Sequence, residues 1–324
     1  MTTALDRALG DLASHSEQWA RLDLSRKLRY LDAMRDSAAA LANSWVDLEL
    51  DRKGLDADSP LAGEEWFAGP YALLTAIRAL RRTLQAVADG ADPLGGAPVH
   101  TRHDGQVVVE VYPGDVFDRL LLNGYRAEVW MQDGVTPANL RDHVASFYKQ
   151  ADPPGRIGLI LGAGNISSIP LLDVLTKLFA EGQVAIVKMN PINEQLGPVF
   201  EEICRDLIDD GYLRFVYGDG GVGAYLTNHD LVDTVHITGS ADTYNTIVFG
   251  PGEVGADRRA RNEPIMTKPF TSELGGVGPT ILVPGPWNEQ DFAYQAEHIA
   301  TQKLHNAGFN CIASQVLVLP EGWS

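Results

Sequence analysis

The sequence predicts an α/β fold in which a parallel sheet is preceded by N-terminal helices and followed by the start of a second α/β unit. Two observations lead to this prediction. Apolar residues at helical spacing run through roughly the first 88 residues, and after residue 152 short, fully apolar runs alternate with helical segments. Strands that are apolar along their whole length belong to parallel sheets covered by helices on both faces. The expected sheet is therefore Rossmann-like.

The composition narrows the class of protein. The 324 residues are 45% apolar and 21% charged, as in globular proteins large enough for two domains. A net charge of −17 argues against a nucleic-acid partner. Two cysteines fit a reducing compartment, and neither a signal peptide nor an apolar run of about 18 residues is visible. We therefore expect a cytoplasmic protein without a membrane partner.

Residues 1–105 are expected to form N-terminal helices that pack on the sheet domain, and residues 106–150 a hairpin or insertion. The first helical face is made of apolar residues spaced three, four or seven apart, namely Leu24, Leu28, Leu31, Ala38, Leu41 and Trp45. A second helix is predicted over 66–87, a loop over 88–98, a strand over 106–112 and a helix over 137–148.

Residues 151–268 carry the alternating pattern of the parallel sheet. Strands are predicted over 157–161, 184–187, 214–217 and 234–237, and helices over 170–180, over 194–210 and from about residue 222, with a basic loop at 258–261. Asn165, Lys188, Gly218 and Gly239 follow these strands. Ligands of such sheets bind beyond the carboxyl ends of the strands, so these four positions form a coherent candidate site.

Residues 269–324 are predicted to begin a second domain, with a helix over 288–306 and a strand over 316–319. Cys311 lies between them on a turn-prone segment, which places a thiol where a substrate can reach it. Glu273 is followed by Gly275 and Gly276, which permit close backbone approach. A thiol and a carboxylate on separate elements indicate a covalent acyl enzyme with a general base that releases it.

Several residues have plainer interpretations. Cys204 lies on the apolar face of a predicted helix and is expected to be a core thiol. His100 and His103 lie in a polar loop without a third ligand, so no metal site is expected. The run 218–223 is glycine-rich but lacks the lysine of a phosphate-binding P-loop, which favours a tight turn. Asn165, Lys188 and Ser240 could instead serve as a turn residue, a surface lysine and a helix cap.

From about Arg156 to Leu319 the sequence resembles the aldehyde dehydrogenase superfamily. The resemblance rests on five motifs in family order: Gly164-Asn165 with Pro170, Val187-Lys188, Ile237-Thr-Gly-Ser240, Ser272-Glu-Leu-Gly-Gly276, and Asn310-Cys311 with Ala313. It implies that Cys311 is the nucleophile, Glu273 the general base and Asn165 an oxyanion-binding amide. It also implies that NAD or NADP is held by Lys188, Gly218, Gly239, Ser240, Gly162, Leu274 and Gly275.

The implied reaction is oxidation of a small-molecule aldehyde to a carboxylic acid through a thiohemiacetal and a thioester on Cys311, in a homo-oligomer when full length. The sequence departs from the family pattern at three places. Pro191 stands where the family often has a ribose-binding glutamate, which leaves NAD and NADP open. Tyr244 replaces a usual glycine, and residues 251–265 look inserted.

Family chains continue far beyond the cysteine strand. We therefore expect this chain to be a fragment or one half of a split enzyme, with no turnover of aldehyde and NAD(P) unless the missing part is supplied. Two alternatives remain open from the sequence. One is a CoA-acylating enzyme that passes the thioester to coenzyme A, although Glu273 favours hydrolysis. The other is a catalytically inactive, cofactor-binding fragment.

Overall fold

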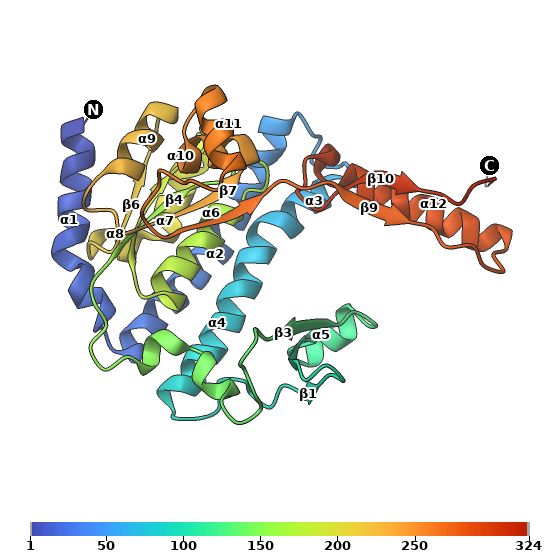
Figure 1. Ribbon diagram of the computed structural model, residues 1–324, viewed down its shortest axis with the longest axis horizontal. Helices are drawn as coiled ribbons and strands as arrows, with labels where there is room; N and C mark the ends of the chain where they lie inside the picture. Colours follow the sequence, from blue (N-terminus) through green and yellow to red (C-terminus); the bar gives the residue numbers. More distant parts are fainter. Residues whose placement is uncertain (1, 323–324) are drawn as a thin grey trace.

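The computed structural model describes residues 2–322, and its centre is a five-stranded parallel sheet (Figure 1). The strands are β4 (Ile157–Leu161), β5 (Val184–Lys188), β6 (Leu213–Val216), β7 (Thr234–Gly239) and β8 (Phe270–Leu274), in the spatial order β6-β5-β4-β7-β8. Every residue of β4 and β5 is buried. The predicted α/β class with a parallel sheet is confirmed.

The N-terminal helices cover this sheet. They are α1 (Thr2–Ala20), α2 (Leu24–Lys53), α3 (Ala62–Trp66), the π-helical turn η1 (Phe67–Tyr71) and α4 (Ala72–Ala88). Helix α2 starts where the Asp23 side chain accepts a hydrogen bond from the Arg26 N–H at 2.9 Å, and it ends at Gly54, whose φ of 63° is left-handed. Helix α1 packs on β4, β5 and β6, while α2 packs on α4 and on α7 (Gly197–Ile203).

The helices between the strands are α6 (Ile169–Leu175), η4 (Thr176–Ala180), η5 (Pro191–Leu196), α7, α8 (Arg205–Asp209), α9 (Gly220–Asn228), α10 (Ala241–Phe249) and α11 (Gly252–Ala260). The single helix predicted over 194–210 is wrong. A separate helix, α7, begins at Gly197 with Pro198 in its first turn, and Cys204 leaves helical geometry, with φ −102° and ψ 15°, before α8. The basic loop at 258–261 is also wrong, because Arg258 and Arg259 form the last turn of α11, where cations favour the helix dipole.

A second, smaller sheet is antiparallel and separate from the main one. Its strands are β1 (Val99–Thr101), β2 (Val107–Tyr112) and β3 (Ala127–Trp130), with α5 (Val116–Leu121) between the last two. His100 therefore belongs to β1 and not to the predicted loop. The helix predicted over 137–148 is wrong. Two 3-10 turns, η2 (Leu140–His143) and η3 (Ser146–Lys149), are separated by Ala145, whose left-handed φ of 50° breaks the helical path.

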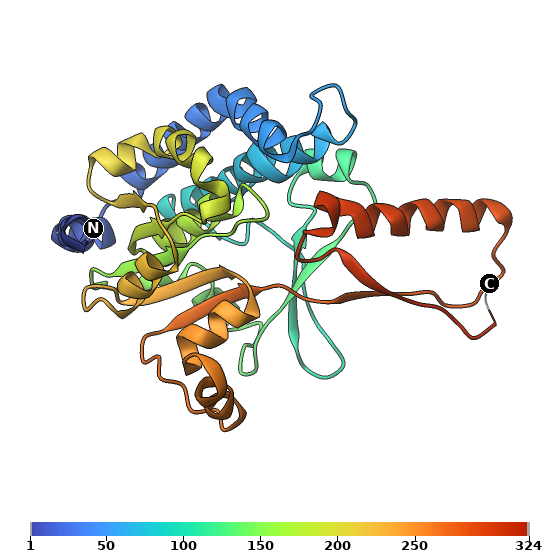
Figure 2. The ribbon, with the colours of Figure 1, turned by 90° about the horizontal axis from the view of Figure 1, so that it is seen from above.

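The C-terminal segment extends away from the main sheet in both ribbon views (Figures 1 and 2). It contains β9 (Gly278–Ile281), α12 (Glu289–Leu304), the 3-10 turn η6 (His305–Gly308) and β10 (Ser314–Val318), which pairs with β9 in parallel. The predicted helix over 288–306 is confirmed, and Asn288 begins it with a capping box. We call residues 276–322 the arm, and residues 2–88 with 151–275 the body. Over residues 2–322, none of the helices has the length and apolar content needed to cross a membrane.

Candidate active site

A pocket of about 400 Å³ lies where the body meets the arm. Its walls come from the loop after β4, the ends of β7 and β8, and the turn before β10. The lining residues are Gly164, Asn165, Thr238, Gly239, Ser240, Glu273, Leu274, Gly275, Gly276, Gly308, Phe309, Asn310, Cys311 and Gln315. From β4 the chain adds β5 and β6 on one side of the sheet, and it then crosses over to add β7 and β8 on the other side. The pocket lies beside this switch in strand order, which is where open α/β sheets bind ligands.

Cys311 is exposed on the turn that precedes β10. Its Sγ–H donates to the Asn310 Oδ1 at 3.7 Å, and the same oxygen accepts from the Ile312 N–H at 2.9 Å. The Ala313 N–H closes the turn on the Asn310 carbonyl at 3.0 Å. The thiol is thereby presented on a structured turn, open to the pocket.

Cys204 has the opposite environment. It is 1% exposed within the core of the body, and burial raises the pKa of its thiol. The prediction that it is a core thiol is confirmed, and a thiol that resists ionisation is a poor nucleophile.

Asn165 lies just after β4 and is held on both sides by the arm. Its Nδ2 donates to the Phe309 carbonyl at 2.9 Å, and its own carbonyl accepts from the Asn306 Nδ2 at 2.9 Å. A side-chain amide carries two N–H groups, so one remains for a ligand in the pocket. Asn306 was not among the residues that the sequence indicated, because its partner lies 141 positions away.

Glu273 stands on β8, opposite Thr238 of β7 in the parallel register. This pairing brings Gly239 and Ser240 to the same edge as Leu274 and Gly275, and the Gly275 N–H donates to the Gly239 carbonyl at 3.3 Å. A side chain placed on Gly275 would meet nothing within 4 Å. The backbone at this edge is therefore open to a flat or extended ligand.

Ser240 caps α10, since its Oγ accepts from the Thr243 N–H at 3.1 Å. The remaining N–H groups of the first turn of a helix are free to bind an anion. The Tyr244 ring on this helix is partly buried and packs against Phe270 of β8, with 5.3 Å between ring centroids. The capping expected of Ser240 is confirmed.

Lys188, Gly218 and Gly162 lie outside the pocket, at the ends of β5, β6 and β4. The Gly162 N–H donates to the Lys188 carbonyl at 3.1 Å. Gly218 has a φ of 122°, and its N–H donates to the Glu194 Oε1 at 2.9 Å. Burial lowers the pKa of Lys188, and the carboxylates of Glu194 and Asp219 oppose that shift.

Glu194 is a second residue that the sequence did not indicate. It lies in η5, three positions after Pro191, and the turn returns its carboxylate to the sheet edge beside Lys188. The glycine-rich run starts with the turn at Gly218, after which Asp219 caps α9 by accepting from the Gly221 N–H at 2.9 Å. Helix α9 thus begins at Gly220, two residues before the predicted start.

Comparison with known proteins identifies the class. The sequence model of the aldehyde dehydrogenase family matches residues 80–324, and the chain belongs to this family. It is 28% identical over 169 residues to a coniferyl aldehyde dehydrogenase of a Pseudomonas species, covering 52% of this chain and 31% of that protein. It is 26% identical over 217 residues to human aldehyde dehydrogenase family 3 member B1, covering 66% of this chain and 41% of that protein.

Solved structures share the fold. A NAD-dependent aldehyde dehydrogenase from Sinorhizobium meliloti superposes with a TM-score of 0.58 at 17% identity, over 99% of this chain and 51% of that one. A mutant of aldehyde dehydrogenase C from Pseudomonas syringae, in complex with NAD+ and octanal, gives a TM-score of 0.52 at 15% identity, over 98% and 51%. The chain spans about a third to two-fifths of the length of the curated relatives.

Proposed function

We propose that this chain carries the catalytic thiol, oxyanion amide and general base of an oxidoreductase that converts an aldehyde to a carboxylic acid with NAD or NADP. The observation that supports the proposal is the single pocket shared by Cys311, Asn165 and Glu273, which are separated by up to 146 positions along the chain. No one element supplies more than one of the three groups.

The proposed reaction starts with attack of the Cys311 Sγ on the aldehyde carbonyl carbon. A C–S bond forms while the carbonyl electron pair moves to oxygen. The free Asn165 N–H and the Cys311 backbone N–H stabilise this oxyanion, a contribution of about 3 to 4 kcal/mol per donor. The thioester forms when the electron pair of the oxyanion returns to carbon and the C–H bond breaks, and a bound nicotinamide ring would accept the hydride that leaves. Glu273 takes a proton from water, which attacks the thioester carbonyl; the C–S bond breaks and the acid leaves.

The residues at the sheet edge fit a dinucleotide. The first turn of α10 at Ser240 offers N–H groups to a pyrophosphate, and the open backbone at Gly275 leaves room beside it. At the adenosine end of the dinucleotide, Lys188 supplies hydrogen-bond donors and Glu194 supplies acceptors for the ribose. An acidic residue at such a site binds the ribose 2′-hydroxyl and repels a 2′-phosphate. We therefore propose that NAD is preferred to NADP.

Transfer of the acyl group to coenzyme A is the competing outcome of the same chemistry. The Glu273 carboxylate lines the pocket that contains Cys311. A base in that position activates water, so we propose hydrolysis as the route of release.

The test uses an ester, p-nitrophenyl acetate, which acylates a nucleophilic thiol without a cofactor. The chain should release a burst of nitrophenolate, with the acetyl group located on Cys311 by mass spectrometry of the peptides. Cys311→Ala should abolish the burst. Glu273→Gln should keep the burst and slow the subsequent turnover by roughly 100-fold or more, so that acetylated protein accumulates.

Acetylation of Cys204 in place of Cys311 would contradict the assignment of the nucleophile. Equal turnover by Glu273→Gln and the parent chain would contradict the assignment of the base. Adding coenzyme A to the acetylated Glu273→Gln protein provides the contrast with acyl transfer: rapid loss of the acetyl group to coenzyme A would overturn hydrolysis as the route of release.

A further inference from the structure

The turn that precedes the thiol has a backbone conformation that needs external support. Asn306 has φ 51° and ψ 47°, and Ala307 follows with φ 52°. Two consecutive non-glycine residues in the left-handed region are uncommon, and alanine has no side-chain compensation for it. Such a conformation persists where surrounding contacts hold it in place.

Those contacts come from the N-terminal helices of the body. The Asn306 Oδ1 accepts from the Lys53 Nζ at the end of α2, at 2.7 Å. The Asn306 backbone N–H donates to the Glu64 Oε2 of α3 at 3.0 Å. Lys53 is fixed in turn by Glu65, with 2.6 Å between Nζ and Oε1 and only 19% and 4% of the two side chains exposed. A charge pair shielded to this degree is a firmer anchor than one at the surface.

The side-chain nitrogen of Asn306 contacts Asn165, the proposed oxyanion-binding residue. Its Nδ2 donates to the Asn165 carbonyl at 2.9 Å, while the Asn165 Nδ2 donates to the Phe309 carbonyl at 2.9 Å. Asn165 is therefore tied to the thiol segment through both its main chain and its side chain. Lys53, Asn306 and the main-chain carbonyl of Asn165 form a continuous chain of hydrogen bonds from α2 to the residue whose side chain is the proposed oxyanion amide.

We infer that Asn306 is a positioning residue that sets the Asn165 amide against the Cys311 thiol, with Lys53 holding Asn306 from α2. This inference rests on the proposed function. The position requires asparagine because one oxygen must accept and one nitrogen must donate. Aspartate keeps the acceptor towards Lys53 and loses the donor to Asn165. Glycine adopts the backbone conformation freely and loses both contacts.

The test separates two reactions of the same thiol in the full chain. Acylation of Cys311 by p-nitrophenyl acetate forms a C–S bond, releases nitrophenolate and passes through an oxyanion, whereas alkylation by iodoacetamide displaces iodide without one. Asn306→Gly and Asn306→Asp should lower the acylation rate roughly 10- to 100-fold, because small misplacement of a catalytic group has effects of this size. Alkylation should stay within about twofold, and Lys53→Met should lower acylation by a smaller factor.

Arg35→Met is the matched control. It removes an exposed cation from α2 that pairs only with Asp32 and Asp36 among the described residues, and both rates should be unchanged. Thermal unfolding of each variant verifies the fold. If an Asn306 variant does not fold, Lys53→Met replaces it in the comparison of acylation with alkylation. Parental acylation rates in the Asn306 variants would overturn the inference. An equal fall in acylation and alkylation would also overturn it, since the thiol itself would then have moved. A parent chain that alkylates but never acylates at Cys311 would instead refute the proposed function.

Discussion

The body and the arm contain the same kinds of apolar residues and bury them to opposite degrees. In the body, one core cluster unites the N-terminal helices with the sheet and includes fully buried Trp19, Trp45 and Phe200. Over residues 256–322 only Ala313 and Ser314 are buried. Helix α12 has no buried residue although it is 16 residues long.

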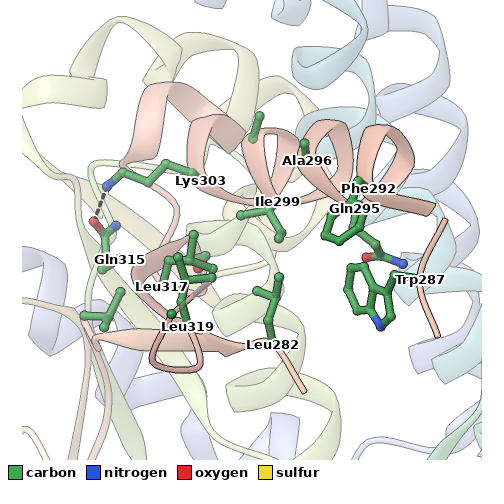
Figure 3. Close-up of a pocket in the computed structure, with 14 residues that line it drawn as sticks. Leu282, Trp287, Phe292, Gln295, Ala296, Ile299, Lys303, Gln315, Leu317 and Leu319 are labelled. Carbon is green, nitrogen blue, oxygen red and sulfur yellow. Dashed lines mark hydrogen bonds between the residues drawn. The ribbon is translucent and has the colours of Figure 1, made fainter. Parts of the chain in front are cut away.

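The apolar side of the arm forms a groove of about 810 Å³ between α12, β10 and the segment that follows β9 (Figure 3). Its apolar lining includes Leu282, Trp287, Phe292, Ala296, Ile299, Val316, Leu317 and Leu319. At one end the Lys303 Nζ donates to the Gln315 Oε1 at 2.6 Å. An exposed apolar surface of this extent is characteristic of an interface.

The comparison shows which residues of the proposed site are fixed by apolar packing. Asn165 and Glu273 belong to the body, whose core fixes their strands, while Cys311 belongs to the arm. The relative position of thiol and amide therefore depends on the hydrogen bonds at the junction. Apolar packing of the arm contributes little to it within the described residues.

The largest expected difference between the regions concerns stability. Phe200→Ala removes a ring that packs against Trp45 with 5.1 Å between centroids, and it should lower the free energy of unfolding by about 3 to 5 kcal/mol. Leu317→Ala in the arm, where the side chain is 47% exposed, should change it by less than about 0.5 kcal/mol. Urea unfolding followed by circular dichroism measures both. Similar losses would show that the arm has a core of its own.

A second prediction concerns pH. Lys27 is buried in the body, and its Nζ lacks a hydrogen-bond partner in the described part of the chain. Three aromatic rings surround this Nζ, with their centroids at 4.8 Å (Trp19), 4.9 Å (Phe147) and 5.1 Å (Tyr148). Burial lowers the pKa of Lys27 from 10.5 to about 8. Because the unfolded chain then binds the Lys27 proton more tightly, Lys27 contributes a rise of stability with pH between these two values.

Lys27→Met should remove this rise. It should also add about 1 to 3 kcal/mol to the free energy of unfolding at pH 7, reduced by the cation–π stabilisation that the three rings give the Lys27 ammonium group. Urea unfolding at a series of pH values from about 7 to 9.5 measures it, below the range in which tyrosines titrate. The exposed Lys303→Met in the arm is the control and should leave the profile unchanged. A pH profile that Lys27→Met does not flatten would contradict the prediction.

The smallest expected effect concerns the edge of the main sheet that we propose binds the cofactor. Glu194→Gln keeps an acceptor for the Gly218 N–H and removes the negative charge beside Lys188. The dissociation constant for NAD should rise roughly fivefold to tenfold, in line with the loss of one charged hydrogen bond, while that for NADP should stay equal or fall. Calorimetric titration measures both. Tighter binding of NADP than of NAD by the parent chain would refute the proposed preference, and a change caused by Leu317→Ala would show that the arm takes part in binding.

Local sequence patterns predicted the elements whose formation depends on near neighbours. The apolar runs predicted β4 and β5 most directly, because a fully buried strand needs apolar residues along its whole length. The more mixed sequences of β6 and β7 belong to strands that are only partly buried. The helix predicted over 288–306 was confirmed, and its start depends on near neighbours, since Asn288 caps the first turn. The helix predicted over 137–148 failed because Phe147 and Tyr148 turn towards Lys27, 120 or more positions away.

The sequence by itself determined the fold class and the motifs around Cys311, Glu273 and Asn165, since each motif is a short run whose residue types suit the proposed chemistry. The tertiary structure decided which residues hold them together. Asn306 meets Lys53 across 253 positions and Glu64 across 242, and Glu194 returns to Lys188 only through the turn of η5. These contacts join segments with no shared periodicity, so the positions of their side chains depend on how the chain packs.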